Sequence, residues 1–215
     1  MNDYIKRTME KTVEKMKKSF PVIMITGPRQ VGKTTLLSIM ADKNKNEKIN
    51  FISLDDLNAR ALAIEDPELF LRTYEMPLII DEFQYAPNLL SYIKIIVDKK
   101  RLENLKNNNV KCNGLFYLTG SQAFETMENV TESLAGRIAI LDMNGLTNRE
   151  IENMEDEVFL PDLEVLKNKR KTEILSTIQV FDKIIKGSYP EIYKNENLDR
   201  NEYFETYIRT YIERD

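Results

Sequence analysis

The sequence has no histidine and only one cysteine, Cys112, among its 215 residues. One cysteine excludes an internal disulfide framework and is typical of a protein of the reducing cytoplasm. The lack of histidine argues against a transition-metal site, because imidazole and thiolate are the usual ligands of such metals. Carboxylates are abundant, and their oxygen atoms are the ligands that magnesium prefers.

Long apolar runs and an excess of positive charge are also missing. The net charge is −4, so no overall basic field favours nucleic acid, although a local basic face stays possible. The first twenty residues mix charged and apolar side chains, which is typical of neither a signal peptide nor a membrane span. We therefore expect a cytoplasmic protein with no membrane partner, large enough for one domain with a subdomain.

Five short apolar runs alternate with segments of helical periodicity over the first two thirds of the sequence. The runs predict strands at residues 22–26, 49–54, 77–81, 115–121 and 137–143. Helices are expected from Ile5 to Phe20, over 57–73 with a break at Pro67, after a capping Asn88, and over 125–136. Such alternation predicts an α/β fold with a five-stranded parallel sheet flanked by helices.

The strand signal stops after Leu146, and two apolar stripes at helical spacing follow. The first stripe lies between residues 174 and 185, and the second runs from Tyr203 to Ile212. We expect an α/β core over residues 1–145 and a helical subdomain over 146–215. Because the last stripe shows no stop signal, we also expect another domain or further chain to cover it.

The strongest motif follows the first predicted strand and opens a helix. Residues 27–34, GPRQVGKT, match the phosphate-binding pattern G-x-x-x-x-G-K-[ST]. Its backbone N–H groups and the helix dipole favour a phosphate, Lys33 would reach the β- and γ-phosphates, and Thr34 would bind Mg²⁺. The expected nucleotide contacts are Gly27, Pro28, Arg29, Gln30, Val31, Gly32, Lys33, Thr34 and Thr35.

Two acidic residues end the third predicted strand. Asp81 falls at the carboxyl edge of the sheet, where ligands bind in open α/β folds, and would hold Mg²⁺ with Thr34. Glu82 would then act as the general base that polarises a water against the γ-phosphate. A nucleotide switch without turnover has no need of such a base, so the pair favours hydrolysis.

Two further polar residues are weaker candidates. Ser121, just past the fourth strand, would orient the attacking water or contact the γ-phosphate; equally, it would make a turn or cap a helix. Arg137, where a helix meets the fifth strand, would stabilise transition-state charge as an arginine finger, or lie solvated at a strand end.

Together these motifs resemble the AAA-superfamily ATPases. The strings ITGPRQVGKTTLL, LIIDEFQYAPNLL, LTGSQ, SLAGRIAILDMNGLTNREI and GSYPEIY are similar to a prokaryotic group of AAA-type ATPases in which a nuclease-like C-terminal domain of uncertain function usually follows. The resemblance covers essentially the whole chain. It implies that Ser121 is the first sensor, that Arg137 is the finger, and that Arg29 and Gln30 shape the loop.

The same resemblance implies that the turn in GSYPEIY packs a lid against adenine, with Gly187 and Pro190 beside the base. A plain helix stop explains that turn equally well. An ATP hydrolase that remodels a partner is the first functional hypothesis. A nucleotide-gated binding or oligomerisation module with little turnover is the second.

Other classes of function fit less well. A small GTPase would need a guanine-binding Asn-Lys-x-Asp motif after a late strand, and the nearest string, 44–47, follows the first helix of the core. A small-molecule kinase would carry an arginine-rich lid and no Asp-Glu strand end. DNA binding through Lys99, Lys100, Arg101 or residues 167–171 stays possible, although solvated helix faces explain these residues better.

Overall fold

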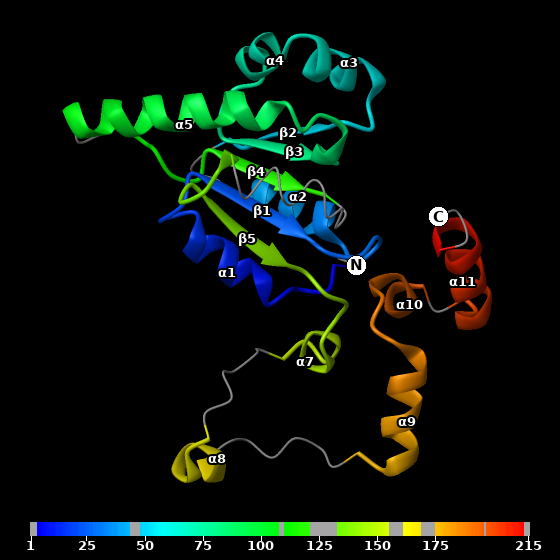
Figure 1. Cartoon of the computed structure of the whole chain (residues 1–215). Helices are drawn as coiled ribbons and strands as arrows, with labels where there is room; N and C mark the ends of the chain where they lie inside the picture. Colours follow the sequence, from blue (N-terminus) through cyan, green and yellow to red (C-terminus); the bar gives the residue numbers. More distant parts are fainter. Residues whose placement is uncertain are drawn as a thin grey trace. The chain divides into compact units, whose positions relative to one another are not determined.

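The computed structural model describes residues 4–43, 48–107, 110–120, 133–154, 161–168, 175–195 and 197–212. Contacts within the chain divide it into two compact units. One unit is Met9–Asn144, and the other combines Met1–Thr8 with Gly145–Asp215. Figure 1 shows the elements of both units, which are described separately below.

The first unit contains a five-stranded sheet in which all described pairs are parallel. Its strands are β1 (Val22–Thr26), β2 (Asn50–Ser53), β3 (Leu78–Asp81), β4 (Phe116–Thr119) and β5 (Ile138–Asp142). The spatial order β2-β3-β4-β1-β5 places β1 inside the sheet, between β4 and β5. The predicted α/β fold with a five-stranded parallel sheet is confirmed, and each strand lies within its expected range.

Helices cover both faces of this sheet (Figure 1). They are α1 (Met9–Met16), α2 (Lys33–Lys43), α3 (Leu57–Glu65), α4 (Pro67–Thr73) and α5 (Leu89–Lys106). Helices α3, α4 and α5 contribute Ala63, Phe70 and Ile93 to the main core, against Met24 and Ile80 of the sheet. Because side chains alternate along a strand, the neighbouring residues face the side that α1 and α2 cover.

Two details of these helices differ from the sequence prediction, and one agrees. The break at Pro67 is confirmed, since α3 ends at Glu65 and Pro67 is the first residue of α4. Asn88 does not cap α5 through its side chain, which instead donates to the carbonyls of Ala63 and Ile64. Helix α1 begins only at Met9, so Ile5 lies outside it. The helix expected over 125–136 falls almost entirely outside the described residues.

The carboxyl ends of the strands meet at one edge of the sheet. The register pairs Ile25 with Thr119 and Ser53 with Asp81. On the other side of β1, Thr26 is paired with Asp142, whose carboxylate accepts a 2.5 Å hydrogen bond from the threonine hydroxyl. The motif residues that follow β1 and end β3 are therefore brought to the same edge, as expected for ligand-binding open α/β sheets.

The second unit is helical where it is described. It contains α7 (Asn148–Ile151), α8 (Leu163–Asn168), α9 (Thr177–Lys186), α10 (Pro190–Lys194) and α11 (Arg200–Tyr207), with a π-helical turn at Ile208–Ile212. Glu150 is buried in this unit, and its carboxylate accepts hydrogen bonds from Arg7 Nε at 3.2 Å and from the Thr8 amide at 2.7 Å. The residues before α1 thus belong with the helices at the other end of the sequence.

The two apolar stripes of this unit have different surroundings. On α9, Ile178, Phe181 and Ile184 are exposed among the described residues. On α11, Tyr203, Phe204 and Tyr207 gather around Tyr189 with ring centroids 5.2–5.9 Å apart. The part of the second stripe on α11 is therefore partly covered by its own unit, which sequence periodicity did not indicate.

Candidate nucleotide-binding site

The loop between β1 and α2 requires glycine at its first position. Gly27 has φ +138°, and a Cβ atom there would lie 2.1 Å from the carbonyl oxygen of Met143. Gly32 has φ +96°, in the left-handed region that glycine adopts without a steric penalty. Between them, Gln30 also has a positive φ of 62°. The loop conformation therefore depends on both motif glycines.

Lys33 is the first residue of α2 and is buried at 8% exposure. Its Nζ donates to the carbonyl oxygens of Gly27 at 2.9 Å and Pro28 at 2.8 Å. Burial lowers the pKa of this ammonium group, and the nearby carboxylates of Glu82 and Asp81 partly oppose that shift. The amine thus lies at the loop, where phosphate oxygens would be stronger partners than neutral carbonyls.

Asp81 at the end of β3 collects hydroxyl groups from three neighbouring elements. Thr34 Oγ1 donates to its Oδ1 at 2.8 Å, Thr119 Oγ1 makes a short bond to the same oxygen, and Ser53 Oγ lies 3.5 Å from Oδ2. The aspartate is 6% exposed. Thr34 and Asp81, predicted to share a metal ion, are therefore in direct contact.

The same cluster has the donor types that suit magnesium. Hydroxyl and carboxylate oxygens are its preferred protein ligands, and it usually takes the remaining positions from water and phosphate. Within the described part of the chain, no group of three histidine, cysteine, aspartate or glutamate side chains gathers as a metal cage. The residues fit an ion that arrives with a nucleotide, with Thr34 and Asp81 as its protein contacts.

Glu82 follows Asp81 in a left-handed backbone conformation, with φ 52° and ψ 41°. The chain then makes a short 3₁₀ turn, Phe83–Tyr85, in which Gln84 Nε2 donates a short hydrogen bond to Glu82 Oε2. Asp81, the residue before Glu82, contacts Thr34 at the start of α2, and the negative charge of Glu82 raises the pKa of Lys33 against the effect of burial. The candidate base and the phosphate-binding lysine thus belong to one site.

The predicted nucleotide contacts of the other loop residues stay predictions, and these side chains differ in exposure. Pro28, Arg29 and Gln30 are exposed, Val31 is buried, and Thr35 is exposed on α2. Sequence analysis missed Ser53, Gln84 and Thr119. Only the position of each near a strand end could have indicated them. Ser121 lies outside the described residues, so its predicted role as a sensor stays a prediction.

Arg137 lies at the opposite edge of the sheet from the loop. It directly precedes β5, and its carbonyl accepts from the Val22 amide at the start of β1. Strand β5 rises by roughly 13 Å between its first and last residues, and this length separates the amino ends of the strands from their carboxyl ends. The Arg137 guanidinium donates to both carboxylate oxygens of Asp98, at 2.7 and 3.0 Å. The finger role of Arg137, on its own chain's nucleotide or on that of a neighbouring copy, stays a prediction, and its present partner is Asp98.

Replacing Arg137 by glutamine is expected to lower the free energy of unfolding by about 0.5 kcal/mol, because half-exposed ion pairs contribute little. The bidentate contact lowers the pKa of the Asp98 carboxyl. This stabilisation is therefore present above the unfolded pKa near about 4 and is lost as pH falls through the folded value. Denaturant titrations of both proteins at pH 7 and pH 3 check the effect. A difference unchanged at pH 3 would contradict it.

Gly187 and Pro190 belong to the helical unit and make a helix stop followed by a helix start. Gly187 has φ +80° and ends α9, and Pro190 is the first residue of α10. The Tyr193 hydroxyl donates to the Gly187 carbonyl at 2.8 Å. The turn is thus explained by local structure, and its predicted contact with adenine stays a prediction.

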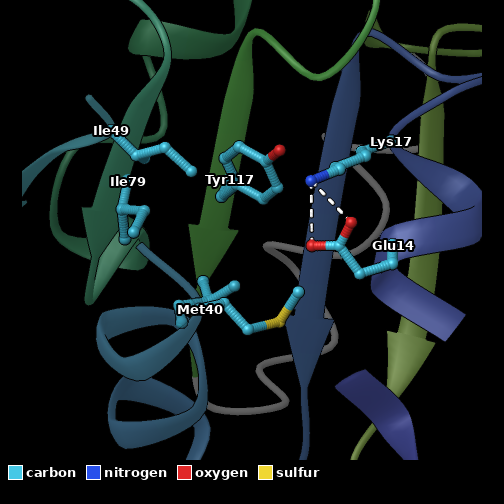
Figure 2. Close-up of a pocket in the computed structure, with 7 residues that line it drawn as sticks. Glu14, Lys17, Met40, Ile49, Ile79 and Tyr117 are labelled. Atoms are coloured by element: carbon cyan, nitrogen blue, oxygen red, sulfur yellow. Dashed lines mark hydrogen bonds and ion pairs between the residues drawn. The ribbon is translucent and has the colours of Figure 1, made fainter. Parts of the chain in front are cut away.

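A shallow pocket lies on the side of the sheet that α1 and α2 cover (Figure 2). Met40 and Ile79 line it together with the aromatic ring of Tyr117, and the Glu14–Lys17 ion pair of 2.6 Å lies at its border. Its volume of about 10 Å³ is enough for one water molecule. None of its lining residues belongs to the phosphate loop, so it is separate from the candidate nucleotide site.

A parallel sheet in which an inner strand, β1, leads through a glycine loop into a helix defines a P-loop nucleoside triphosphatase fold. The family model described as an AAA domain matches residues 19–152, which is more than half of the chain. The chain therefore belongs to this AAA-domain family, as the resemblance predicted.

The curated relatives are uncharacterized proteins of mycobacteria. Rv2008c of Mycobacterium tuberculosis and Mb2031c of Mycobacterium bovis are each 34% identical over 131 residues. That match covers 61% of this chain but 26% of each relative, so the chain spans about a quarter of the length of these proteins.

Solved structures with a related fold include two nucleotide-bound proteins. They are AMPPCP-bound DnaA of Aquifex aeolicus, with 16% identity and a TM-score of 0.47, and the ORC2 protein of Aeropyrum pernix, with 15% identity and a TM-score of 0.40. The matches cover 92% and 71% of this chain, and 64% and 52% of the respective structures. Among the described helices of this chain, none combines the length and apolar character needed to span a membrane.

Proposed function

We propose that this chain binds ATP with Mg²⁺ at the loop 27–34 and hydrolyses it. The observation that carries the proposal is the contact of Thr34 with Asp81, next in sequence to the buried Lys33. The negative charge of Glu82 raises the pKa of this lysine against the effect of burial. Membership of the AAA-domain family supports nucleotide binding and ATPase activity as a class. The chain's single cysteine supports a cytoplasmic setting.

Binding would exchange the contacts that Lys33 makes now. Its ammonium group leaves the Gly27 and Pro28 carbonyls for the β- and γ-phosphate oxygens, and the loop amides and the start of α2 bind the same charge. A bound Mg²⁺ would neutralise the charge that develops on the phosphates. Thr34 and Asp81 hold it, and the hydroxyls of Thr119 and Ser53 fix the orientation of the Asp81 carboxylate.

The chemical step is an attack of water on the γ-phosphorus. Glu82 accepts the proton of this water as the new oxygen–phosphorus bond forms and the bond to the bridging oxygen breaks, releasing ADP. The proton then passes to the phosphate product, which restores the carboxylate. We further propose that the change between bound states repositions a partner or an attached domain, with homo-oligomerisation as one form of that coupling.

Replacing Thr34 by valine is expected to lower Mg²⁺-dependent ATP turnover by about 10- to 100-fold. Valine keeps the shape of threonine but lacks the hydroxyl that donates to Asp81 and would bind the metal. Steady-state phosphate release, titrated with Mg²⁺, measures the loss and the higher metal requirement. Thr73→Val, at an exposed position of α4, removes a hydroxyl that donates to the Leu69 carbonyl and serves as the matched control. Equal turnover in both variants would contradict a metal role for Thr34.

A nucleotide-gated binding module is the second candidate. The observation that favours it is the row of exposed apolar side chains on α9, including Ile178, Phe181 and Ile184. In this proposal ATP changes the conformation of residues 145–215 or the oligomeric state, and turnover is incidental. Proteolysis and sedimentation with ATP, ADP and no nucleotide test it. Unchanged cleavage of residues 145–215 together with an unchanged sedimentation coefficient would reject it.

The basic residues of α5 give little support to DNA binding, because two of them have partners within the chain. Lys100 pairs with Glu103 at 3.5 Å, and Arg101 donates to the Gly136 carbonyl at 3.1 Å. These contacts are those of a solvated helix face. Salt-dependent DNA affinity, if found, would restore the proposal.

A further inference from the structure

Gln84 engages the carboxylate of Glu82 through one oxygen only. Its Nε2 donates to Glu82 Oε2, and in the described part of the chain no hydrogen bond reaches Oε1. An amide can orient a carboxylate without neutralising it, because it brings two donors but no charge. Glu82 is therefore held at one oxygen while the other is left for a water molecule.

The amide of Gln84 lies against the backbone of Gly120. A Cβ atom at Gly120, the residue after β4, would lie 2.6 Å from Gln84 Oε1. The absence of a side chain at Gly120 gives the glutamine its space. The chemistry also fixes which way the amide points, since an oxygen turned towards Glu82 would repel the carboxylate.

Two features of this arrangement are energetically unfavourable. Gln84 Oε1 is buried and, among the described residues, has no hydrogen-bond partner. Glu82 adopts a left-handed conformation that a residue with a Cβ atom rarely takes. Unsatisfied buried groups and strained backbones concentrate at functional sites, where geometry is kept at the expense of stability.

We infer that Gln84 is a positioning residue for hydrolysis, which holds the Glu82 carboxylate towards the water that attacks the γ-phosphate. The inference rests on the proposed ATPase function and on Glu82 as its base. Glu82 directly follows Asp81, which accepts a hydrogen bond from Thr34 at 2.8 Å, so the held carboxylate belongs to the phosphate-binding end of the sheet. Gln84 acts through Glu82 and makes no contact of its own with the substrate.

The test uses Gln84→Met, which keeps the length of the side chain and removes its donors. We expect kcat to fall by about 10- to 30-fold, with the ATP dissociation constant and the melting temperature almost unchanged. Asn88→Ala is the matched control, because Asn88 lies in the same segment and donates to Ala63 and Ile64 away from the site. A merely structural role would lower the melting temperature and weaken ATP binding in Gln84→Met.

A double-mutant cycle with Glu82→Gln decides whether Gln84 acts through Glu82. Single-turnover rates should show that Gln84→Met has no further effect once the carboxylate is gone. The same fold-loss in both backgrounds would overturn the inference, as would undiminished kcat in Gln84→Met alone. If Glu82→Gln hydrolyses ATP as fast as the unaltered protein, Glu82 is not the base and the inference falls with it. A lack of ATP hydrolysis by the unaltered protein would instead overturn the proposed function, and that result is distinct from a failure confined to Gln84.

Discussion

Replacing Glu82 by glutamine is expected to reduce ATP turnover by about 100-fold or more, while ATP affinity stays within about 3-fold. Glutamine has nearly the shape of glutamate but does not accept a proton at neutral pH. The metal and phosphate contacts of Thr34, Asp81 and Lys33 are unaffected by the change. The loss should therefore fall on kcat and leave the bound state intact.

Two measurements distinguish a defect in the chemical step from a defect in ATP binding. Pre-steady-state phosphate release gives the rate of the chemical step directly, and equilibrium titration with ATP and Mg²⁺ gives the affinity. The melting temperature should rise with added ATP in both proteins, because a ligand that binds the folded state stabilises it. Undiminished hydrolysis would remove Glu82 from the role of base. A parallel loss of ATP affinity would show instead that the substitution disturbed the loop.

Replacing Gly27 by alanine should be the most damaging small change in the site. The added Cβ would lie 2.1 Å from the Met143 carbonyl oxygen, and the backbone φ of +138° is one that alanine rarely adopts. Relief requires β1 and the residue after β5 to separate or the loop to refold. We expect the unfolding free energy to fall by about 2–4 kcal/mol and ATP binding to weaken by about 100-fold or more.

Gly136→Ala is the matched control for this substitution. Gly136 also has a positive φ, of 70°, but within the described residues nothing beyond its immediate chain neighbours lies within 4 Å of the position of its added Cβ. It should show the conformational cost of alanine alone, of the order of 1 kcal/mol, with normal ATP binding. Denaturant titration and calorimetry of both variants make the comparison. Equal effects would mean that the close approach to Met143 is not what Gly27 provides.

The loop and its acids are predictable from sequence because their chemistry is local. Eight consecutive residues supply the turn, the ammonium group and the hydroxyl, and an apolar strand ending in Asp81 supplies the metal ligand. The parallel topology then needs only the alternation of buried runs with helical segments. The predicted strands at 22–26 and 77–81 were accurate because a strand buried on both faces leaves a continuous apolar signal.

Contacts that join distant parts of the chain gave no such signal. Thr119 is one threonine among many until the register brings β4 beside β3 and its hydroxyl to Asp81. Arg137 has the sequence surroundings of a finger, but its position at the start of β5 places it at the edge away from the loop. Arg7 and Glu150 form a buried ion pair although they are 143 residues apart in the sequence, so no local pattern indicates their contact.

By itself, the sequence determined the fold class, the phosphate loop and the identity of the acidic pair, since these depend on residue type, spacing and hydrophobic periodicity. Only the tertiary structure decided which hydroxyls reach Asp81, that Gln84 donates to Glu82, and that Arg137 pairs with Asp98. The physical reason is the same in each case. Strand register and the spatial order of strands bring side chains together independently of their separation along the chain.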